Sequence, residues 1–180
     1  MIDHELLARL RLEPLDRKKH DRAAFSCGEP RVDKFLTDFA AGQQDNDFTR
    51  VTVCCLDSAV AVIGYYAMNA HSIDISSLPE GIRKKLPKYP TVGALYLSVV
   101  GVHIDFQSKG VGEHLMVQAF RDAVTVADKA GAHFIVLDSL NDRAAKLYRR
   151  LGFVDLPEQG RRMLIGMKAV RKAVELADKS

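Results

Sequence analysis

The chain contains 180 residues, of which 47% are hydrophobic and 27% are charged, and its formal net charge is +3 at pH 7. This length and composition are typical of one globular domain that buries about 70% of the surface of its unfolded chain. No apolar run approaches the roughly 20 residues that cross a bilayer, and the N-terminus lacks the basic flank and apolar run of a signal peptide. We therefore expect a single cytoplasmic domain spanning residues 1–180, with no membrane partner.

The cysteine content argues against disulfides and against a structural metal. The chain has three cysteines, and Cys54 and Cys55 are adjacent. This number and spacing form neither a disulfide framework nor a zinc site. Both adjacent residues fall in a predicted strand, where neighbouring side chains point to opposite faces. We expect them to be packing residues in a chain that binds no metal.

The first third of the chain predicts a strand, a loop and a helix. Residues 10–15 alternate weakly and predict a strand, and residues 20–28 have the composition of a loop. A helix is expected from Pro30, which a first helical turn tolerates, and Gly42 with the polar run 43–47 is expected to end it. Its core-facing stripe is expected to contain Val32, Phe35, Leu36, Phe39 and Ala40.

A hairpin and an irregular segment follow. Residues 50–56 and 60–69 predict two strands joined by a polar turn at Asp57-Ser58, and the second strand is apolar enough to be covered on both faces. Residues 70–92 read as the largest irregular region, with a short helix expected over residues 78–86. Long insertions of this kind often shape a substrate pocket.

The central stretch, residues 95–120, predicts a strand, a glycine-containing turn and a helix. A turn such as Gln107–Gly112 presents unpaired backbone N–H groups at a helix N-terminus, where the helix dipole favours an anion such as phosphate. Gly110 and Gly112 would allow close approach of a ligand. Glu113-His114 excludes a P-loop, and the glycine spacing excludes the dinucleotide fingerprint. By itself the turn fits both a phosphate site and a plain structural turn.

The C-terminal part predicts a strand, a short helix, two strands and a helical tail. Residues 132–140 form the strand, Asn141 or Asp142 caps a helix over residues 143–151, and Gly152 ends that helix. The final strands are expected at residues 153–154 and 163–167, around a turn at 157–160. The tail, residues 168–179, reads as a basic amphipathic helix that packs on the body, on a second subunit or on a partner.

Two motifs in this order resemble the GNAT superfamily of N-acetyltransferases. Gln107-x-x-Gly110-x-Gly112 resembles the family's pyrophosphate loop, and Ala144 to Phe153 resembles its Ala-x-x-(Phe/Tyr)-Tyr-x-x-x-Gly-Phe ending, with Leu147 at the variable aromatic position. The order of the predicted elements is also that of the family. The resemblance implies an α/β fold whose mostly antiparallel sheet is splayed between strands 4 and 5 and flanked by helices. It implies acetyl-CoA as the cofactor.

The same resemblance supplies candidate site residues. Tyr148 is the candidate general acid toward the leaving thiolate, or alternatively an aromatic residue that packs behind the cofactor. Asn141 either hydrogen-bonds pantetheine or only caps its helix. Gly101 eases a bulge in the strand. The candidate cofactor-binding residues are Val100 and Val102 through their N–H groups, and Gln107, Ser108, Lys109, Gly110, Val111 and Gly112 in the loop.

A narrower resemblance covers most of the chain and points to the acetyltransferase toxins of type II toxin–antitoxin modules. The shared segments are His20-Asp21-Arg22, Phe25-x-Cys27-Gly28, Asp33-x-Phe35-Leu36, Gly64-Tyr65-Tyr66, Leu78-Pro79 and Leu86-Pro87-x-Tyr89-Pro90. Such toxins acetylate the α-amine of charged tRNA, and their partner is usually a ribbon-helix-helix antitoxin. The candidate tRNA contacts are Arg83, Lys84, Lys85, Lys88, Arg143, Arg149, Arg150, Arg161 and Arg162. We also expect a homodimer.

One segment departs from the toxin pattern and keeps alternatives open. The toxins commonly carry Gly-Arg-Leu-Ala-Val-Asp where this chain has residues 98–103, Ser-Val-Val-Gly-Val-His. We read His103 as a solvent-facing residue at the strand end. No carboxylate stands out as a general base, which favours an α-amine acceptor because its pKa is near 7.7–8.0, against about 10.4 for lysine. The alternatives are an acetyltransferase for a small amine or a protein, and a non-catalytic CoA-binding module.

Overall fold

The computed structural model describes residues 2–179 and divides them into two compact units. The N-terminal unit contains the residues up to Asn69 together with Ser98–Ala119, and the C-terminal unit contains Ala70–Leu97 together with the residues from Phe120 onward. Within the described residues, seven strands form one mixed sheet in the order β1-β2-β3-β4-β5-β7-β6. Two of its strands, β3 (Gly64–Asp74) and β4 (Thr91–Val102), and the helix α5 (Val111–Ala130) contribute residues to both units. The expectation of a single domain stays a prediction.

The N-terminal unit is built on an antiparallel meander. A short helix, α1 (His4–Ala8), precedes β1 (Leu10–Pro14), which pairs with β2 (Arg50–Leu56), and β2 pairs with the first half of β3. The predicted strands at residues 10–15 and 50–56 are confirmed. The third strand begins at Gly64 and not at residue 60, because residues 60–62 pair with the preceding loop: the Asp21 N–H donates to the Val60 carbonyl, and the Val62 N–H donates to the Asp21 carbonyl.

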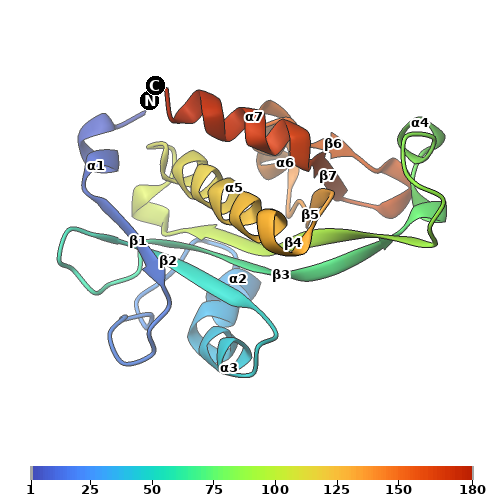
Figure 1. Cartoon of the computed structure of the whole chain (residues 1–180). Coiled ribbons are helices and arrows are strands. Elements are labelled where there is room, and N and C mark those ends of the chain that lie inside the picture. The colour runs from blue at the N-terminus through green and yellow to red at the C-terminus, as the bar shows by residue number, and fades with distance from the viewer. Residues whose placement is uncertain (1, 180) are drawn as a thin grey trace. The chain divides into compact units, whose positions relative to one another are not determined.

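A helical segment packs against this meander (Figure 1). It consists of α2 (Pro30–Lys34), a π-helical turn over Phe35–Phe39 and α3 (Ala40–Asp45). The helix continues past Gly42 and ends at Asp45, inside the polar run that was predicted to end it. In its last turn the Gln44 side chain donates to the Leu15 carbonyl, just after β1, and accepts from the Val51 N–H of β2.

The π-helical turn changes which residues reach the core. The predicted stripe is correct for Leu36 and Ala40, which are fully buried, but Phe39 is 49% exposed. A π turn contains more residues than an α turn, so the α-helical spacing fails at this point. The Arg22 guanidinium donates to the carbonyls of Leu36 (3.2 Å) and Thr37 (3.5 Å) and satisfies backbone groups of the turn.

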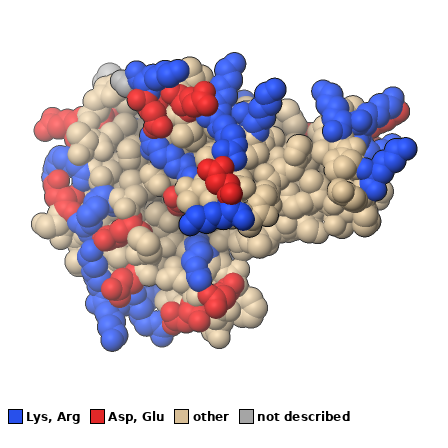
Figure 2. All heavy atoms as spheres, in the orientation of Figure 1, with Lys and Arg blue, Asp and Glu red and all other residues tan. Residues whose placement is uncertain are grey.

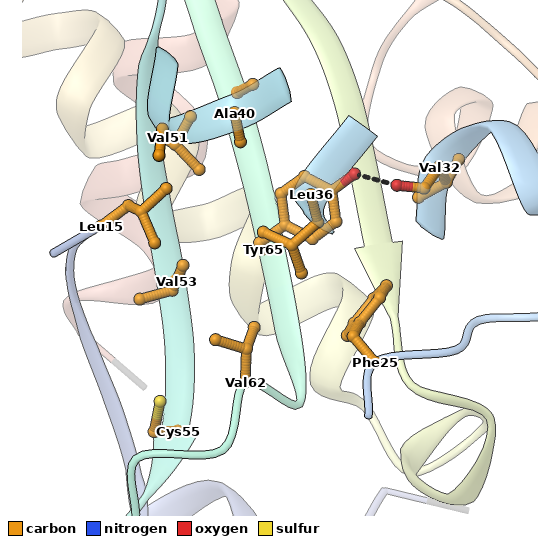
Figure 3. Close-up of a cluster of buried hydrophobic side chains, with 12 residues drawn as sticks. Leu15, Phe25, Val32, Leu36, Ala40, Val51, Val53, Cys55, Val62 and Tyr65 are labelled. Atoms are coloured by element: carbon orange, nitrogen blue, oxygen red, sulfur yellow. Dashed lines mark hydrogen bonds between the residues drawn. The ribbon is translucent and has the colours of Figure 1, made fainter. Parts of the chain in front are cut away.

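Figure 3 shows the apolar core of the N-terminal unit, where side chains of the helical segment meet those of β2 and β3. Tyr65 is fully buried at the centre, and its hydroxyl donates to the Val32 carbonyl at 2.7 Å. The Phe25 ring meets the Tyr65 ring edge-on, with 5.4 Å between centroids. Cys54 and Cys55 are both buried, as expected of packing residues, and burial raises the pKa of the Cys54 thiol to about 12.

The C-terminal unit contains the remaining strands and a second apolar cluster. Here β4 pairs in parallel with β5 (Phe134–Asp138), β5 pairs with β7 (Arg162–Gly166), and β7 pairs with β6 (Val154–Asp155). The helix α4 (Glu80–Arg83) is shorter than predicted and ends before Pro87. The helix α6 (Asp142–Arg150) matches the prediction within one residue. Short 3₁₀ turns occupy Ile75–Ser77, Ile104–Phe106 and Pro157–Gln159.

The tail forms a helix, α7 (Met167–Ala177), as predicted. It runs beside the second half of α5 (Figure 1). Two ion pairs join these helices: Arg171 with Asp128 at 2.6 Å, and Arg121 with Asp178 at 2.7 Å. Val170 is fully buried, so the tail packs on its own unit. From residue 2 to residue 179, no helix is long and apolar enough to cross a membrane, and no group of potential metal ligands is found.

Candidate active site

The turn before α5 has the backbone shape of an anion-binding loop. Ser108 and Gly110 both have positive φ, at 62° and 94°. The helix begins at Val111, and its first intrahelical bond reaches from the His114 N–H to the Gly110 carbonyl. Val111 and Gly112 stand in the first turn of α5, where N–H groups lack the carbonyl partners that later turns of a helix have. Backbone N–H groups at such a helix N-terminus can form a cradle for a negatively charged group.

Two predicted loop ligands use their side chains inside the protein. The Gln107 amide donates to the carbonyls of Cys27 (2.7 Å) and Val102 (2.9 Å), which ties the loop to β4 and to the segment before α2. The Lys109 ammonium donates to the Asp105 carbonyl at 2.9 Å and lies 5.6 Å from the centre of the Phe106 ring. These side chains therefore help to shape the loop.

The N-terminal segment braces the loop from another side, which sequence reasoning missed. The Asp3 N–H donates to the Lys109 carbonyl at 3.1 Å. A Cβ on Gly110 would lie 3.3 Å from Cγ2 of Ile2 and 3.4 Å from Cδ1 of Leu7. The Asp3 carboxylate caps α1 by accepting from the Leu6 N–H at 2.9 Å. The only sequence signal was this capping residue in front of an apolar pair.

Substitution of Gly110 by alanine tests the loop. We expect the Kd for CoA to rise about tenfold, because the φ of 94° is strained for alanine by about 1–2 kcal/mol and because the new methyl group presses on Ile2 and Leu7. Calorimetric titration with CoA measures the effect. The matched control is Gly160→Ala, which has a φ of 69° and open space around its Cβ. Equal CoA affinity in both variants would contradict the assigned role of the loop.

The predicted N–H donors of β4, Val100 and Val102, lie at the end of the strand. The His103 N–H donates to the Ile63 carbonyl at 2.8 Å and therefore faces the β3 edge. Successive N–H groups of a strand point to opposite edges. A bulge in β4 before His103 interrupts this alternation, so the directions of the Val100 and Val102 N–H groups stay predictions. The parallel β4–β5 register ends at Tyr96↔Val136, although both strands continue, so β5 does not pair with these donors. This confirms the predicted splay between strands 4 and 5.

One extra residue in β4 produces a bulge. Two backbone bonds flank the paired strands: His103 N–H to the Ile63 carbonyl, and Ile75 N–H to the Pro90 carbonyl. From one bond to the other, the chain through β3 advances 12 residues (63 to 75) and the chain through β4 advances 13 (90 to 103). A regular antiparallel ladder advances equally on both strands, so β4 carries a bulge. Gly101 has a further reason to be glycine: a Cβ there would lie 2.7 Å from Cγ1 of Val32 and 3.1 Å from the Tyr65 ring.

Tyr148 lies on α6 in the C-terminal unit and is 8% exposed. Its ring packs against Phe153 at 5.8 Å between centroids, and Phe153 packs against Phe120. Burial raises the pKa of Tyr148 to about 12. Its hydroxyl has no hydrogen bond to any residue from 2 to 179. Among those residues, every fully buried side-chain nitrogen or oxygen has a hydrogen-bond partner, so this hydroxyl is not fully buried. The hydroxyl therefore reaches the surface, protonated and available to a ligand.

Asn141 caps α6, which was one of the two roles predicted for it. Its side-chain oxygen accepts from the Ala144 N–H at 2.9 Å, and the residue is exposed. A carbonyl oxygen has a second lone pair, so contact with pantetheine stays a prediction.

Comparison with known proteins identifies the family. The model of the Acetyltransferase (GNAT) domain matches residues 49–155. This chain belongs to the GNAT acetyltransferases. It is 34% identical to a probable toxin TacT of Sinorhizobium fredii, with 89% of this chain and 92% of the relative covered. It is also 29% identical to a tRNA-acetylating toxin of Mycobacterium tuberculosis, with 86% and 90% covered.

Solved structures of GNAT toxins share the fold over almost the whole chain. AtaT complexed with acetyl-methionyl-tRNAfMet superposes with a TM-score of 0.81 at 25% identity, covering 91% of this chain and 98% of that one. AtaTR bound with AcCoA gives the same TM-score and identity, with 92% and 98% covered. The predicted mixed α/β sheet flanked by helices is thereby confirmed.

The basic residues of this GNAT chain that were predicted to contact tRNA differ in their availability. Several are held by carboxylates: Arg149 by Asp155, Arg161 by Asp142, Arg162 by Asp138 and Lys84 by Glu80. Arg143 and Arg150 are exposed and also have interactions with other residues. Lys85 and Lys88 are exposed and form no salt bridge within residues 2–179. The α4 segment therefore offers the least committed positive charge.

His103, at the end of β4, is not the solvent-facing residue that the sequence predicted. Its side chain is only 20% exposed and its ring meets those of Phe25 and Phe106, with centroids about 6 Å apart. Its Nδ1 accepts from the Asp105 N–H at 3.2 Å and caps the 3₁₀ turn. His103 therefore supports the turn that leads into the loop, which explains why it is enclosed.

Proposed function

We propose that this chain transfers the acetyl group of acetyl-CoA to the α-amine of aminoacyl groups on charged tRNA, and that it acts as a toxin that blocks translation. The observation that carries the proposal is the similarity, over 86% of the chain or more, to a tRNA-acetylating toxin and to AtaT, whose complex contains acetyl-methionyl-tRNA. A charged-tRNA substrate assigns the protein to the cytoplasm. The partner protein is a ribbon-helix-helix antitoxin, and the toxin is a homodimer.

The loop before α5 fits the pyrophosphate of acetyl-CoA. The backbone N–H groups at the start of α5, next to the positive φ of Gly110, are the donors that a phosphate needs. The N–H groups of Val100 and Val102 are the donors for the pantetheine arm and the acetyl carbonyl. Fixed donors that face a developing negative charge are among the largest contributions to acyl-transfer catalysis.

Acetyl-CoA supplies the acetyl group as a thioester, which a neutral amine can attack directly. The amine loses one proton when the amide forms, and the sulfur gains one when the thiol leaves. Tyr148 is the donor to the departing sulfur. Its pKa of about 12 exceeds the value near 8.5 of an ordinary thiol, so its hydroxyl stabilises the departing thiolate by donating a hydrogen bond and keeps its own proton at equilibrium. The net proton that the thiolate takes up is the one that the amine releases. An α-amine, with a pKa near 7.7–8.0, needs little help from a base.

A second candidate function is acetylation of a small amine or of a protein. The observation that favours it is the altered β4 segment, where Val99 stands in place of the arginine that is common in the toxins. Val99 packs on the apolar core of the N-terminal unit and offers no charge to a tRNA phosphate. The acceptor therefore has to be tested directly.

The purified protein should be mixed with acetyl-CoA and bulk charged tRNA, and the acetylated aminoacyl esters should be identified after hydrolysis. Free amines and peptides are run in parallel with a thiol-release readout. We expect acetylated aminoacyl-tRNA and growth arrest on expression, both lost in Tyr148→Phe. Thiol release with amines or peptides alone would support the second function. CoA binding without any thiol release would leave a non-catalytic module.

A further inference from the structure

A short arm of the C-terminal unit, residues 76–90, carries α4 and is firmly held at its base. The Ile75 N–H donates to the Pro90 carbonyl at 3.0 Å, and the Gln159 side chain donates to the Ser77 carbonyl at 3.0 Å. Leu78 is buried in the apolar cluster of this unit, and Ile82 and Leu86 pack against it. The outer side chains of the arm therefore project from a fixed base.

The arm is strongly basic. It carries Arg83, Lys84, Lys85 and Lys88 against a single acidic residue, Glu80, which pairs with Lys84 at 2.7 Å. Figure 2 shows Lys and Arg side chains gathered around α4. Among residues 2–179, no carboxylate pairs with the other three cations of the arm, so a polyanion is the favoured ligand.

The arm also exposes a large aromatic ring. Tyr89 is 66% exposed, although tyrosine usually buries most of its ring. It lies between Pro87 and Pro90, and its N–H donates to the Pro87 carbonyl at 2.9 Å. The two prolines restrict the backbone, so Tyr89 is presented outward from a stiff turn beside Lys88.

An exposed aromatic ring among unpaired lysines is the combination that binds single-stranded nucleic acid. The ring stacks on an unpaired base and the lysines contact the neighbouring phosphates. A double helix offers phosphates but no accessible base face, so the ring would have no partner there. The acceptor end of a tRNA is single-stranded and carries the aminoacyl group, and it must approach the enzyme for acetyl transfer.

We propose that this arm binds the unpaired 3′ end of charged tRNA, with Tyr89 stacking on a base and with Lys85 and Lys88 contacting adjacent phosphates. The inference rests on the proposed function, because it requires charged tRNA to be the acceptor. It adds a recognition residue, Tyr89, that is neither a cation nor part of the cofactor loop.

The first test compares Tyr89→Ala and Tyr89→Phe on two acceptors, charged tRNA and an amino acid methyl ester. We expect Tyr89→Ala to lower kcat/KM for charged tRNA by about 5- to 150-fold, the range that corresponds to stacking on one base, through KM more than kcat. Tyr89→Phe keeps the ring and should stay within about twofold of wild type. Neither variant should change kcat/KM for the ester, which lacks a nucleic acid.

The second test uses salt. The double variant Lys85→Ala/Lys88→Ala should reduce the slope of log KM for charged tRNA against log salt by about 0.7 for each phosphate that is no longer neutralised. Lys168→Ala, an exposed lysine on α7, is the matched control and should leave the slope unchanged. An unchanged slope in the double variant would show that these lysines do not touch the tRNA backbone.

The outcomes separate the two proposals. A wild-type protein that acetylates the ester but no charged tRNA overturns the proposed function. A wild type that acetylates charged tRNA, with Tyr89→Ala equally efficient, overturns only the arm. An equal loss in Tyr89→Phe and Tyr89→Ala, or an equal loss on the ester, rejects stacking.

Discussion

Replacement of Tyr148 by phenylalanine should lower kcat by about 10²- to 10⁴-fold, the usual contribution of a positioned proton donor in the transition state. The substitution removes only the hydroxyl, and the ring keeps its packing against Phe153. Since the hydroxyl has no hydrogen bond to residues 2–179, its loss leaves no protein group unsatisfied. The variant should therefore fold normally, with an unchanged Tm.

Steady-state kinetics with both substrates, together with calorimetric titration of CoA, measure this prediction. A loss confined to kcat, with CoA affinity retained, places the hydroxyl in the reaction step. An active Tyr148→Phe enzyme would assign Tyr148 to the other interpretation, an aromatic ring that packs behind the cofactor. A variant that loses activity and Tm together would show a structural role.

The pH dependence gives a separate readout for the same residue. With a pKa raised to about 12 by burial, Tyr148 stays protonated over the range in which enzymes are assayed. The rate should therefore rise with pH as the acceptor α-amine loses its proton near 7.7–8.0, and it should then stay level. A decline in kcat just above pH 8 that is absent from Tyr148→Phe would contradict the raised pKa.

The predictable parts of this chain were those encoded in local chemistry. Glycine at 110 with a polar turn before an amphipathic helix, and Asn141 at a helix start, depend on backbone rules that operate within a few residues. The strands at 10–14 and 50–56 followed from apolar patterning. Tyr148 was found through the motif around it, although its burial and raised pKa needed the structure.

The features that sequence reasoning missed depend on distant neighbours. The π-helical turn at Phe35–Phe39 is supported by Arg22, and Gln44 ties the last turn of α3 to Leu15 and to β2. The Gln107 amide turned inward because carbonyls of Cys27 and Val102 meet there. Charge counting also treated Arg149, Arg161 and Arg162 as available, whereas aspartates hold them.

Gly101→Ala should be the most damaging small substitution in the N-terminal unit. The new Cβ would lie 2.7 Å from Cγ1 of Val32, 3.1 Å from the Tyr65 ring and 3.3 Å from Phe25. Overpacking of this kind costs about 1–3 kcal/mol of the free energy of unfolding. The clash also displaces β4 between Val100 and Val102, the two proposed N–H donors, so kcat should fall together with stability.

Urea unfolding and kinetics measure both effects, and two further variants isolate the cause. Gly42→Ala is the matched control: it lies inside α3 with open space around its Cβ, and alanine should stabilise the helix by about 0.5–1 kcal/mol. Val32→Ala removes the closest clashing atom, so Gly101→Ala/Val32→Ala should lose less stability than the two single changes combined. Additive losses would mean that Gly101 is required by the β4 backbone itself, with the packing of Val32 a secondary matter.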